Sequence, residues 1–161
     1  MTDSTSPSLT HLDQNGQAQI VDITDRAITH RTARVSGRVS ISREVYQLIS
    51  SNGISKGNVL EIARIAGIMG AKKTPELIPL CHPIAITGVE IALTLLEGAI
   101  EISARVKTND KTGVEMEGFT AVAVAALTVI DMIKAVDPTA SIGAIQLEEK
   151  SGGKNGDWVR P

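Results

Sequence analysis

Hydrophobic and polar residues alternate with period two along several segments of the chain, which is the pattern of half-buried strands. The first segment lies within residues 32–41, and two more follow at 88–98 and 99–108. Gly98 separates the latter two, so we expect them to form a hairpin. A last strand is expected over IGAIQLEE, residues 142–149.

Two segments between the first strand and the hairpin place apolar residues at helical spacing. Ser42 offers an N-cap for a helix that reaches Ile49. A second helix is expected over NVLEIARIAGIMGAKK, residues 58–73, with Pro75 just beyond its end.

A third helix is expected over FTAVAVAALTVIDMIKAV, residues 119–136, where the only charges are Asp131 and Lys134. Residues three apart share a helix face, so this carboxylate and ammonium can meet. Charged groups are rarely buried unless they are paired. We therefore expect a buried pair with tuned pKa values at a functional site. The alternatives are a structural ion pair and a lysine whose stem lies on the core while its ammonium reaches water.

The order of these elements is β-α-β-β-α-β, the split βαβ pattern of ferredoxin-like α+β folds. It predicts one antiparallel sheet with the helices on one face. The 161 residues suit a single domain, which we assign to 20–150. Residues 1–19 are expected to form a flexible arm, and the Gly-rich residues 151–161 a flexible tail.

Composition argues against several classes of partner. The net charge of −2 provides no global field that would attract nucleic acid or a membrane. RNA-binding ferredoxin-like domains stack bases on aromatic side chains, and the expected strands have none. The apolar run 118–130 is shorter than the roughly 20 residues that span a bilayer. A single cysteine and the lack of a signal-like N-terminus predict a cytoplasmic protein.

Two acidic residues stand at the N-terminal end of the third helix, and a histidine stands in the loop before the hairpin. Glu115 and Glu117 fall in the first turn of the helix, where carboxylates complement its dipole. Glu117 lies about 21 Å from Asp131 along the axis. The two ends could serve different parts of an extended ligand, or sites completed by another subunit. His82 lies between prolines that fix the backbone, which indicates function as readily as a surface position.

Metal binding is not indicated by the motifs. Cys81 and His82 are adjacent, which is poor geometry for chelating one ion, and no second Cys/His pair exists. Cys81 is expected to be a small core residue rather than a nucleophile. No cofactor is expected, although Mg²⁺ could accompany a bound triphosphate.

Two other segments could bind phosphate. Lys56, Gly57 and Asn58 combine an ammonium with free backbone N–H groups at a helix start, without the spacing of a P-loop. The tail residues 151–156, which include Lys154, could fold over a polyphosphate or remain loose in solvent.

These motifs together resemble the cyclic pyranopterin monophosphate synthase (MoaC) family of molybdenum cofactor biosynthesis. The resemblance spans about Val21 to Asp157 and is carried by ARIAGIMGAKKTPELIPLCHP, KTGVEMEGFTAVAVAALTVIDMIKAV and KSGGKNGD. It implies a ferredoxin-like lyase that converts (8S)-3',8-cyclo-7,8-dihydroguanosine 5'-triphosphate to cyclic pyranopterin monophosphate and pyrophosphate. It also implies a homohexamer, a trimer of dimers with sites at the dimer interfaces.

The resemblance also implies roles for individual residues. Asp131 matches the active-site aspartate of the family, and Lys134 and Lys56 match its essential lysines. Further matches to substrate-contacting positions are Leu80, Cys81, His82, Glu115, Met116, Glu117, Lys150 and Lys154. The chain departs from the family at Asn58, where many members have Asp, and at Gly118-Phe119, where many have Ala-Leu.

Two other interpretations remain open on sequence alone. A non-catalytic ferredoxin-like module could bind a regulatory ligand, although it would gain nothing from charges in an apolar helix. A member of the family that has lost its activity would retain the same motifs. Release of pyrophosphate from a nucleoside triphosphate separates an enzyme from both.

Overall fold

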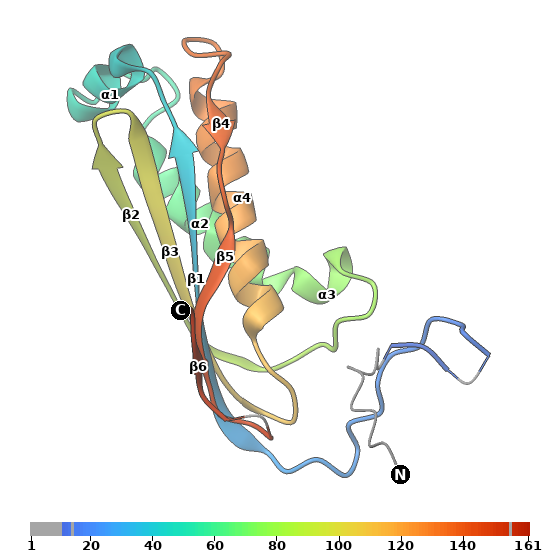
Figure 1. Cartoon of the computed structure of the whole chain (residues 1–161). Helices are drawn as coiled ribbons and strands as arrows, with labels where there is room; N and C mark the ends of the chain where they lie inside the picture. The colour runs from blue at the N-terminus through green and yellow to red at the C-terminus, as the bar shows by residue number, and fades with distance from the viewer. Residues whose placement is uncertain (1–10, 14, 155) are drawn as a thin grey trace.

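The computed structural model of the protein describes residues 11–13, 15–154 and 156–161 (Figure 1). Within these residues, six strands form one sheet in the order β2-β3-β1-β5-β6, and β4 pairs with the end of β1. Every pairing is antiparallel. The strands are β1 (Thr29–Ser40), β2 (Ile86–Leu96), β3 (Ala99–Asp110), β4 (Ser141–Ile142), β5 (Gln146–Ser151) and β6 (Trp158–Val159).

The order of the strands confirms the ferredoxin-like α+β fold. β1 and β3 pair along their whole lengths, from Thr29 opposite Asp110 to Ser40 opposite Ala99. β2 lies outside β3, and β5 lies on the other side of β1. The hairpin between β2 and β3 turns at Gly98, whose φ of 84° is one that glycine adopts without strain.

The helices α2 and α4 cover one face of the sheet, as expected from the sequence (Figure 1). The helices are α1 (Arg43–Ser50), α2 (Val59–Lys72), α3 (Thr74–Leu77) and α4 (Glu115–Ile133). Ser42 caps α1 by accepting a hydrogen bond from Val45 N, and Asn58 caps α2 by accepting one from Glu61 N. Both caps satisfy backbone donors that the first helical turn leaves free.

Glycines on α2 allow this helix to lie very close to α4. A Cβ on Gly67 would lie 2.9 Å from Ala121 O and 3.2 Å from Ala125 Cβ, and one on Gly70 would lie 2.9 Å from Val124 Cβ. The two helices are antiparallel, so the start of α2 lies beside the end of α4. This arrangement determines which loops meet at each end of the pair.

The core between the helices and the sheet is almost wholly aliphatic. Its largest fully buried side chains are Ile100, Ile102, Ile133, Val35, Val39, Val45, Val59, Val106, Val114, Val122 and Val129. On β1 the buried residues alternate with half-buried and exposed ones, so its other face is polar. There Arg34 and Arg105 both contact the Glu149 carboxylate, at 3.2 and 2.8 Å.

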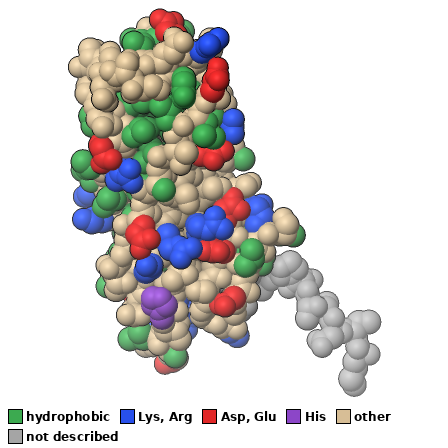
Figure 2. Space-filling view, turned by 90° about the vertical axis from the view of Figure 1, so that its left-hand side faces the viewer, with side chains coloured by type: hydrophobic (Ala, Val, Ile, Leu, Met, Phe, Trp, Pro, Cys, Tyr) green, Lys and Arg blue, Asp and Glu red, His purple; other side chains and the backbone are tan. Residues whose placement is uncertain are grey.

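Acidic and basic side chains are mixed on the surface rather than separated. Figure 2 shows them next to one another over the side that carries β2, with a group of hydrophobic side chains in the upper half. One pair between the strands is Lys107 with Glu90, at 2.8 Å. This side of the molecule therefore carries both signs of charge side by side.

Three elements differ from the sequence-based expectation. The short helix α3 follows α2 directly, because Pro75 fits the first turn of a new helix. The expected strand 142–149 is divided into β4 and β5. The sheet also extends into residues 151–161, since Trp158 pairs with Lys150 and Val159 with Glu149. Of the expected arm 1–19, residues 1–10 and 14 lie outside the described part.

α4 is long and apolar enough to cross a membrane by length and composition alone. In the fold it packs against α2 and against strands β1 and β3, and more than half of its residues are buried. The central helix of a globular domain meets the same criterion, so the fold accounts for its apolar composition.

Candidate functional site

The three residues expected to be catalytic meet at the C-terminal end of α4. Asp131 accepts a hydrogen bond from Lys134 Nζ at 2.7 Å on one carboxylate oxygen, and its other oxygen lies 3.2 Å from Lys56 Nζ. Lys56 also donates to the Asp131 backbone carbonyl at 2.7 Å. One carboxylate thus holds two ammonium groups that are 78 residues apart in the sequence (56 to 134).

The expectation that Asp131 and Lys134 form a buried pair is wrong for the single chain. The side chains of Asp131 and Lys134 are 60% and 61% exposed, and that of Lys56 is 47% exposed. The reason is their position: α4 ends at Ile133, and Asp131 and Lys134 lie on the solvent side of its end while Met132 and Ile133 point inward. The ammonium of Lys134, and then that of Lys56, hold the pKa of Asp131 below its ordinary value.

Lys56 reaches Asp131 because of the loop between α1 and α2. Ile54 is buried and anchors this loop on the core, and Gly57 has a φ of 103° that reverses the chain before the Asn58 cap. The helix start at 56–58, which the sequence offers as a phosphate site, directs Lys56 toward α4, where its Nζ contacts Asp131. Asn58 serves as an N-cap, a role that Asn and Asp fill about equally well.

A second group of expected site residues lies at the N-terminal end of α4. Glu117 is only 2% exposed, and burial raises its pKa to about 7, with a further contribution from the nearby Glu115 carboxylate. Burial, and then the charge of Glu117, raise the pKa of the Cys81 thiol. A raised pKa disfavours the thiolate, which is the nucleophilic form of cysteine. Cys81 is half-buried rather than a full core residue.

The departure at Gly118 has a local packing reason. Gly118 lies against β1, and a Cβ at this position would lie 2.7 Å from Val35 Cγ2. In this chain the glycine lets α4 pack closely on Val35, next to the buried Glu117.

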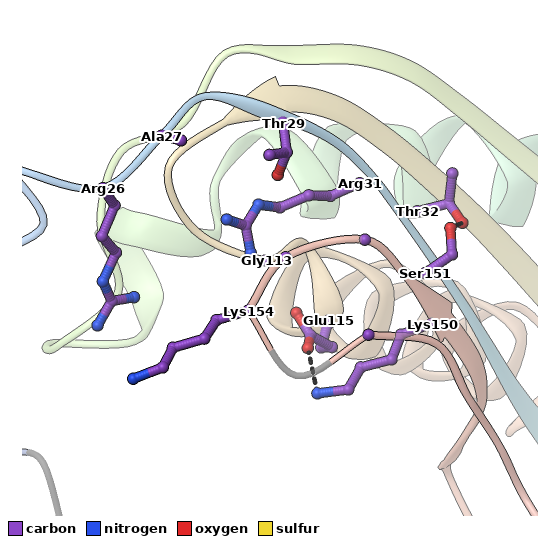
Figure 3. A pocket seen from close by; sticks show the side chains of 13 residues that line it. Arg26, Ala27, Thr29, Arg31, Thr32, Gly113, Glu115, Lys150, Ser151 and Lys154 are labelled. Carbon is purple, nitrogen blue, oxygen red and sulfur yellow. Dashed lines mark hydrogen bonds and ion pairs between the residues drawn. The ribbon is translucent and has the colours of Figure 1, made fainter.

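A cavity of about 660 Å³ lies beside Glu115 (Figure 3). Glu115 and Lys150 form an ion pair of 3.0 Å in its wall. Figure 3 shows Arg26 from the segment before β1, Arg31 from β1, and Lys154 from the segment after β5 grouped around the same space. Four basic side chains and one carboxylate give this cavity the chemistry of a polyphosphate site.

The Gly-rich segment after β5 is shaped by its contacts with β1. Gly152 and Gly153 have φ values of 85° and 81°, and side chains there would collide with His30 O and the Arg31 guanidinium respectively. Asp157 accepts a hydrogen bond from Gly152 N at 3.0 Å. These contacts hold the segment that carries Lys154 beside the cavity.

The remaining expected residues lie near the same end of α4 but are engaged differently. His82 Nε2 donates a hydrogen bond to Val21 O at 2.7 Å and so holds the segment that leads to Arg26. Leu80 is half-buried, and Met116 is 37% exposed. His82 thus has a contact of its own within the chain.

The sequence did not indicate Arg26 and Arg31 as site residues. Arg31 lies in β1, donating to Asp110 O at 3.0 Å and to Lys111 O at 3.2 Å. Only the pairing of β1 with β3 and β5 places it between the loop before α4 and the Gly-rich segment. The available signal was a pair of arginines close to the start of the first strand.

The two groups lie at opposite ends of one rigid helix. Fourteen residues separate Glu117 from Asp131, or about 21 Å along α4. The structure therefore assembles Lys56, Asp131 and Lys134 in one place, and Glu115, Lys150 and Lys154 in another. Within the described residues, no three His, Cys, Asp or Glu side chains are grouped so as to hold a metal ion.

The sequence matches the model of the MoaC family over residues 20–153. The chain belongs to the MoaC family. It is 57% identical to the cyclic pyranopterin monophosphate synthase of Streptomyces griseus, covering 98% of this chain and 89% of that protein. It is 55% identical to the synthase of Thermomicrobium roseum, covering 94% and 93%. It is also 52% identical to cyclic pyranopterin monophosphate synthase 2 of Mycobacterium tuberculosis, covering 99% and 95%.

Among solved structures, the de novo designed protein Foldit4 is similar at a TM-score of 0.28 and 13% identity, covering 78% of this chain. A TM-score this low carries no argument about the fold.

Proposed function

We propose that this MoaC family protein is a cyclic pyranopterin monophosphate synthase in molybdenum cofactor biosynthesis. It converts (8S)-3',8-cyclo-7,8-dihydroguanosine 5'-triphosphate to cyclic pyranopterin monophosphate and pyrophosphate. The observation that carries the proposal is the meeting of Lys56 and Lys134 on the one carboxylate of Asp131. An arrangement of two ammonium groups on one carboxylate suits proton transfer and stabilisation of negative charge.

The reaction includes proton transfers at the rings and attack of a sugar hydroxyl on the α-phosphorus. The attacking oxygen forms a bond to that phosphorus, the bond to the bridging oxygen breaks, and pyrophosphate leaves. A base must accept the hydroxyl proton, and cations must neutralise the departing pyrophosphate. Lys134, oriented by Asp131, and Lys56 share the acid–base steps in this proposal.

The other end of α4 supplies binding groups. Lys150 and Lys154 hold phosphate oxygens in the cavity of Figure 3, where Arg26 and Arg31 add positive charge. Glu117, with a pKa of about 7, can donate or accept a hydrogen bond near neutral pH, which suits contact with the polar edge of a purine-derived ring. The remaining substrate contacts in this assignment come from Leu80, Cys81, His82, Glu115 and Met116.

Conversion of the triphosphate is tested directly by pyrophosphate release. Purified protein is expected to release one pyrophosphate for each cyclised nucleotide consumed, with cyclic pyranopterin monophosphate as the other product. Phosphate detection after pyrophosphatase treatment measures the pyrophosphate, and mass spectrometry identifies the cyclic pyranopterin monophosphate. Binding of the nucleotide without any pyrophosphate would instead favour the non-catalytic module or a member that has lost activity.

The active site is completed by a second copy of the chain in this proposal, within a homohexamer built as a trimer of dimers. The support is the 21 Å axial separation: Lys134 and Lys150 of one chain lie at opposite ends of α4, too far apart to serve one reacting group. In a symmetric dimer, the Lys134 end of one chain can face the Lys150 end of its partner.

Mixing two inactive variants tests this arrangement. Lys134→Ala and Lys150→Ala subunits, co-expressed in equal amounts, are expected to recover about a quarter of wild-type activity. Each shared site takes Lys134 from one chain and Lys150 from its partner, and random pairing supplies both lysines in about one site in four. Lys134→Ala mixed with Lys56→Ala is the matched control, because both changes affect the same end and no intact site can form. Absence of recovery in the first mixture, despite verified mixed hexamers, would place each complete site within one chain.

We also propose that the enzyme acts in the cytoplasm and needs no resident cofactor. Mg²⁺ would enter with the triphosphate, as it usually binds through substrate phosphates and only one or two protein carboxylates. Pyrophosphate release in the presence of EDTA, with and without added Mg²⁺, measures whether the ion is needed.

A further inference from the structure

A buried carboxylate outside the proposed catalytic group joins the two segments that carry its lysines. Asp137 is 5% exposed and lies three residues after Lys134. One oxygen accepts a hydrogen bond from Ser42 N at 2.7 Å. The other accepts from Thr139 N at 3.0 Å and from Thr139 Oγ1 at 2.7 Å. None of the proposed chemical steps uses this group.

The contacts of Asp137 close the turn that follows α4. Asp137 N and Val136 N both donate to Ile133 O, at 2.9 and 2.8 Å, so the residues after Lys134 fold back on the helix end. Lys134 is the first residue of this turn and is bonded to Ile130 O through its own N–H, at 2.9 Å. The backbone that carries Lys134 is therefore fixed from both sides.

The partner of Asp137 is the first residue of the segment that leads to Lys56. Ser42 is the N-cap of α1, and the chain after α1 runs through the buried Ile54 to Lys56. The end of α4 and this segment are thus joined twice. One link is the buried bond from Ser42 to Asp137, and the other is the exposed contact of Lys56 with Asp131.

The two links differ in strength. Exposed ion pairs contribute little, because water competes for both charges. A buried carboxylate that accepts hydrogen bonds from backbone N–H groups is held much more firmly. The Asp137 link is therefore the firmer of the two, and it adds to the buried Ile54 in fixing where the segment that carries Lys56 meets the end of α4.

We propose that Asp137 is a positioning residue that sets the location of Lys56 relative to Lys134 by joining the end of α4 to the start of α1. The inference rests on the proposed function, because it assigns a consequence to the placement of two catalytic lysines. Displacements of about 1 Å at a reacting centre can lower rates by about 100-fold.

The first test is the isosteric change Asp137→Asn. The kcat for pyrophosphate release is expected to fall about 10- to 100-fold while KM changes less than about threefold, since the Asp137 carboxylate bonds to Ser42 and Thr139 and to none of the proposed phosphate-binding residues. Ile91→Val, a core substitution beside Gly67, serves as the control for a general loss of stability. Its kcat at a temperature where it is folded is expected to stay within about twofold of wild type.

A double-mutant cycle with Lys56→Ala separates positioning from a general structural role. If Asp137 acts through Lys56, the Asp137→Asn change is expected to cost less than about threefold in a Lys56→Ala background. Equal losses in both backgrounds would overturn the inference. So would a crystal structure of Asp137→Asn in which Lys56 Nζ keeps its bonds to Asp131.

A milder variant covers the case in which Asp137→Asn does not fold. Thr139→Val removes one hydroxyl donor to Asp137 from an exposed residue, and kcat is expected to fall about threefold or more at unchanged KM. Wild-type kcat in a folded Thr139→Val protein would contradict the proposal. Failure of the wild-type protein to release pyrophosphate would instead refute the proposed function, and the crystal structure would still test the geometry.

Discussion

Replacing Lys134 by alanine is expected to lower kcat for pyrophosphate release by about 100- to 10,000-fold, the usual contribution of a positioned general acid or base. Lys134 donates to Asp131 at 2.7 Å and is exposed in the single chain, so the change removes an ammonium without opening a core cavity. The melting temperature and far-UV circular dichroism are therefore expected to match those of wild type. Pyrophosphate release under saturating substrate measures the effect.

Lys134→Arg distinguishes proton transfer from charge. Arginine keeps the positive charge and can pair with Asp131, but it does not give up its proton near neutral pH. If Lys134 transfers a proton, Lys134→Arg is expected to be nearly as inactive as Lys134→Ala. Activity of Lys134→Ala within a few-fold of wild type would refute the assignment, and rescue by Lys134→Arg alone would reduce the role of Lys134 to electrostatics.

The free energy of unfolding of the wild-type protein is expected to fall as the pH rises, and replacing Glu117 by glutamine is expected to abolish that decrease. Burial raises the pKa of Glu117 from an ordinary value of 4.5 to about 7. Between these values the folded protein binds a proton that the unfolded chain has released. The free energy of unfolding therefore falls with rising pH in this interval, by about 3 kcal/mol in total from this group.

The measurement is urea unfolding of wild type and Glu117→Gln from about pH 4 to about pH 8. As the pH rises from about 4 to about 7, the unfolding free energy of wild type is expected to fall by about 3 kcal/mol relative to that of Glu117→Gln. Above about pH 7 the difference between the two proteins is expected to stay constant. Glu97→Gln, an exposed carboxylate of the hairpin turn, is the control for removing any one negative charge. A difference that does not change with pH would show that Glu117 has the same pKa in the folded and the unfolded protein, and so would refute the raised value.

Local patterns were sufficient for most of the secondary structure. Period-two alternation predicted β1, β2 and β3, and helical spacing predicted α1, with its cap at Ser42, and α2. The order of these elements then predicted the ferredoxin-like topology, because few ways exist to bury their apolar faces together. Trp158 and Val159 were missed, since a two-residue edge strand depends on β5 for its hydrogen bonds.

At the candidate site, local sequence patterns predicted which residues lie near one another on α4 but not which of them are buried. Helical spacing predicted correctly that Asp131 and Lys134 meet, and that Glu117 lies far from them on the same helix. It could not predict exposure. Glu117 and Asp131 point in nearly the same direction around α4, yet Glu117 is buried and Asp131 is open to solvent. The difference depends on which neighbouring segments cover each end of the helix.

The sequence by itself determined the fold class, the apolar central helix and the residue types of the site, because each of these depends on neighbours within a few residues. Only the tertiary structure decided that Lys56 shares Asp131 with Lys134, that Asp137 joins the end of α4 to α1, and that Arg26 and Arg31 line the cavity with Lys150. These contacts join residues far apart along the chain. Their geometry follows from the close antiparallel packing of α2 on α4 and from the pairing of β1 with its neighbours, which no local pattern encodes.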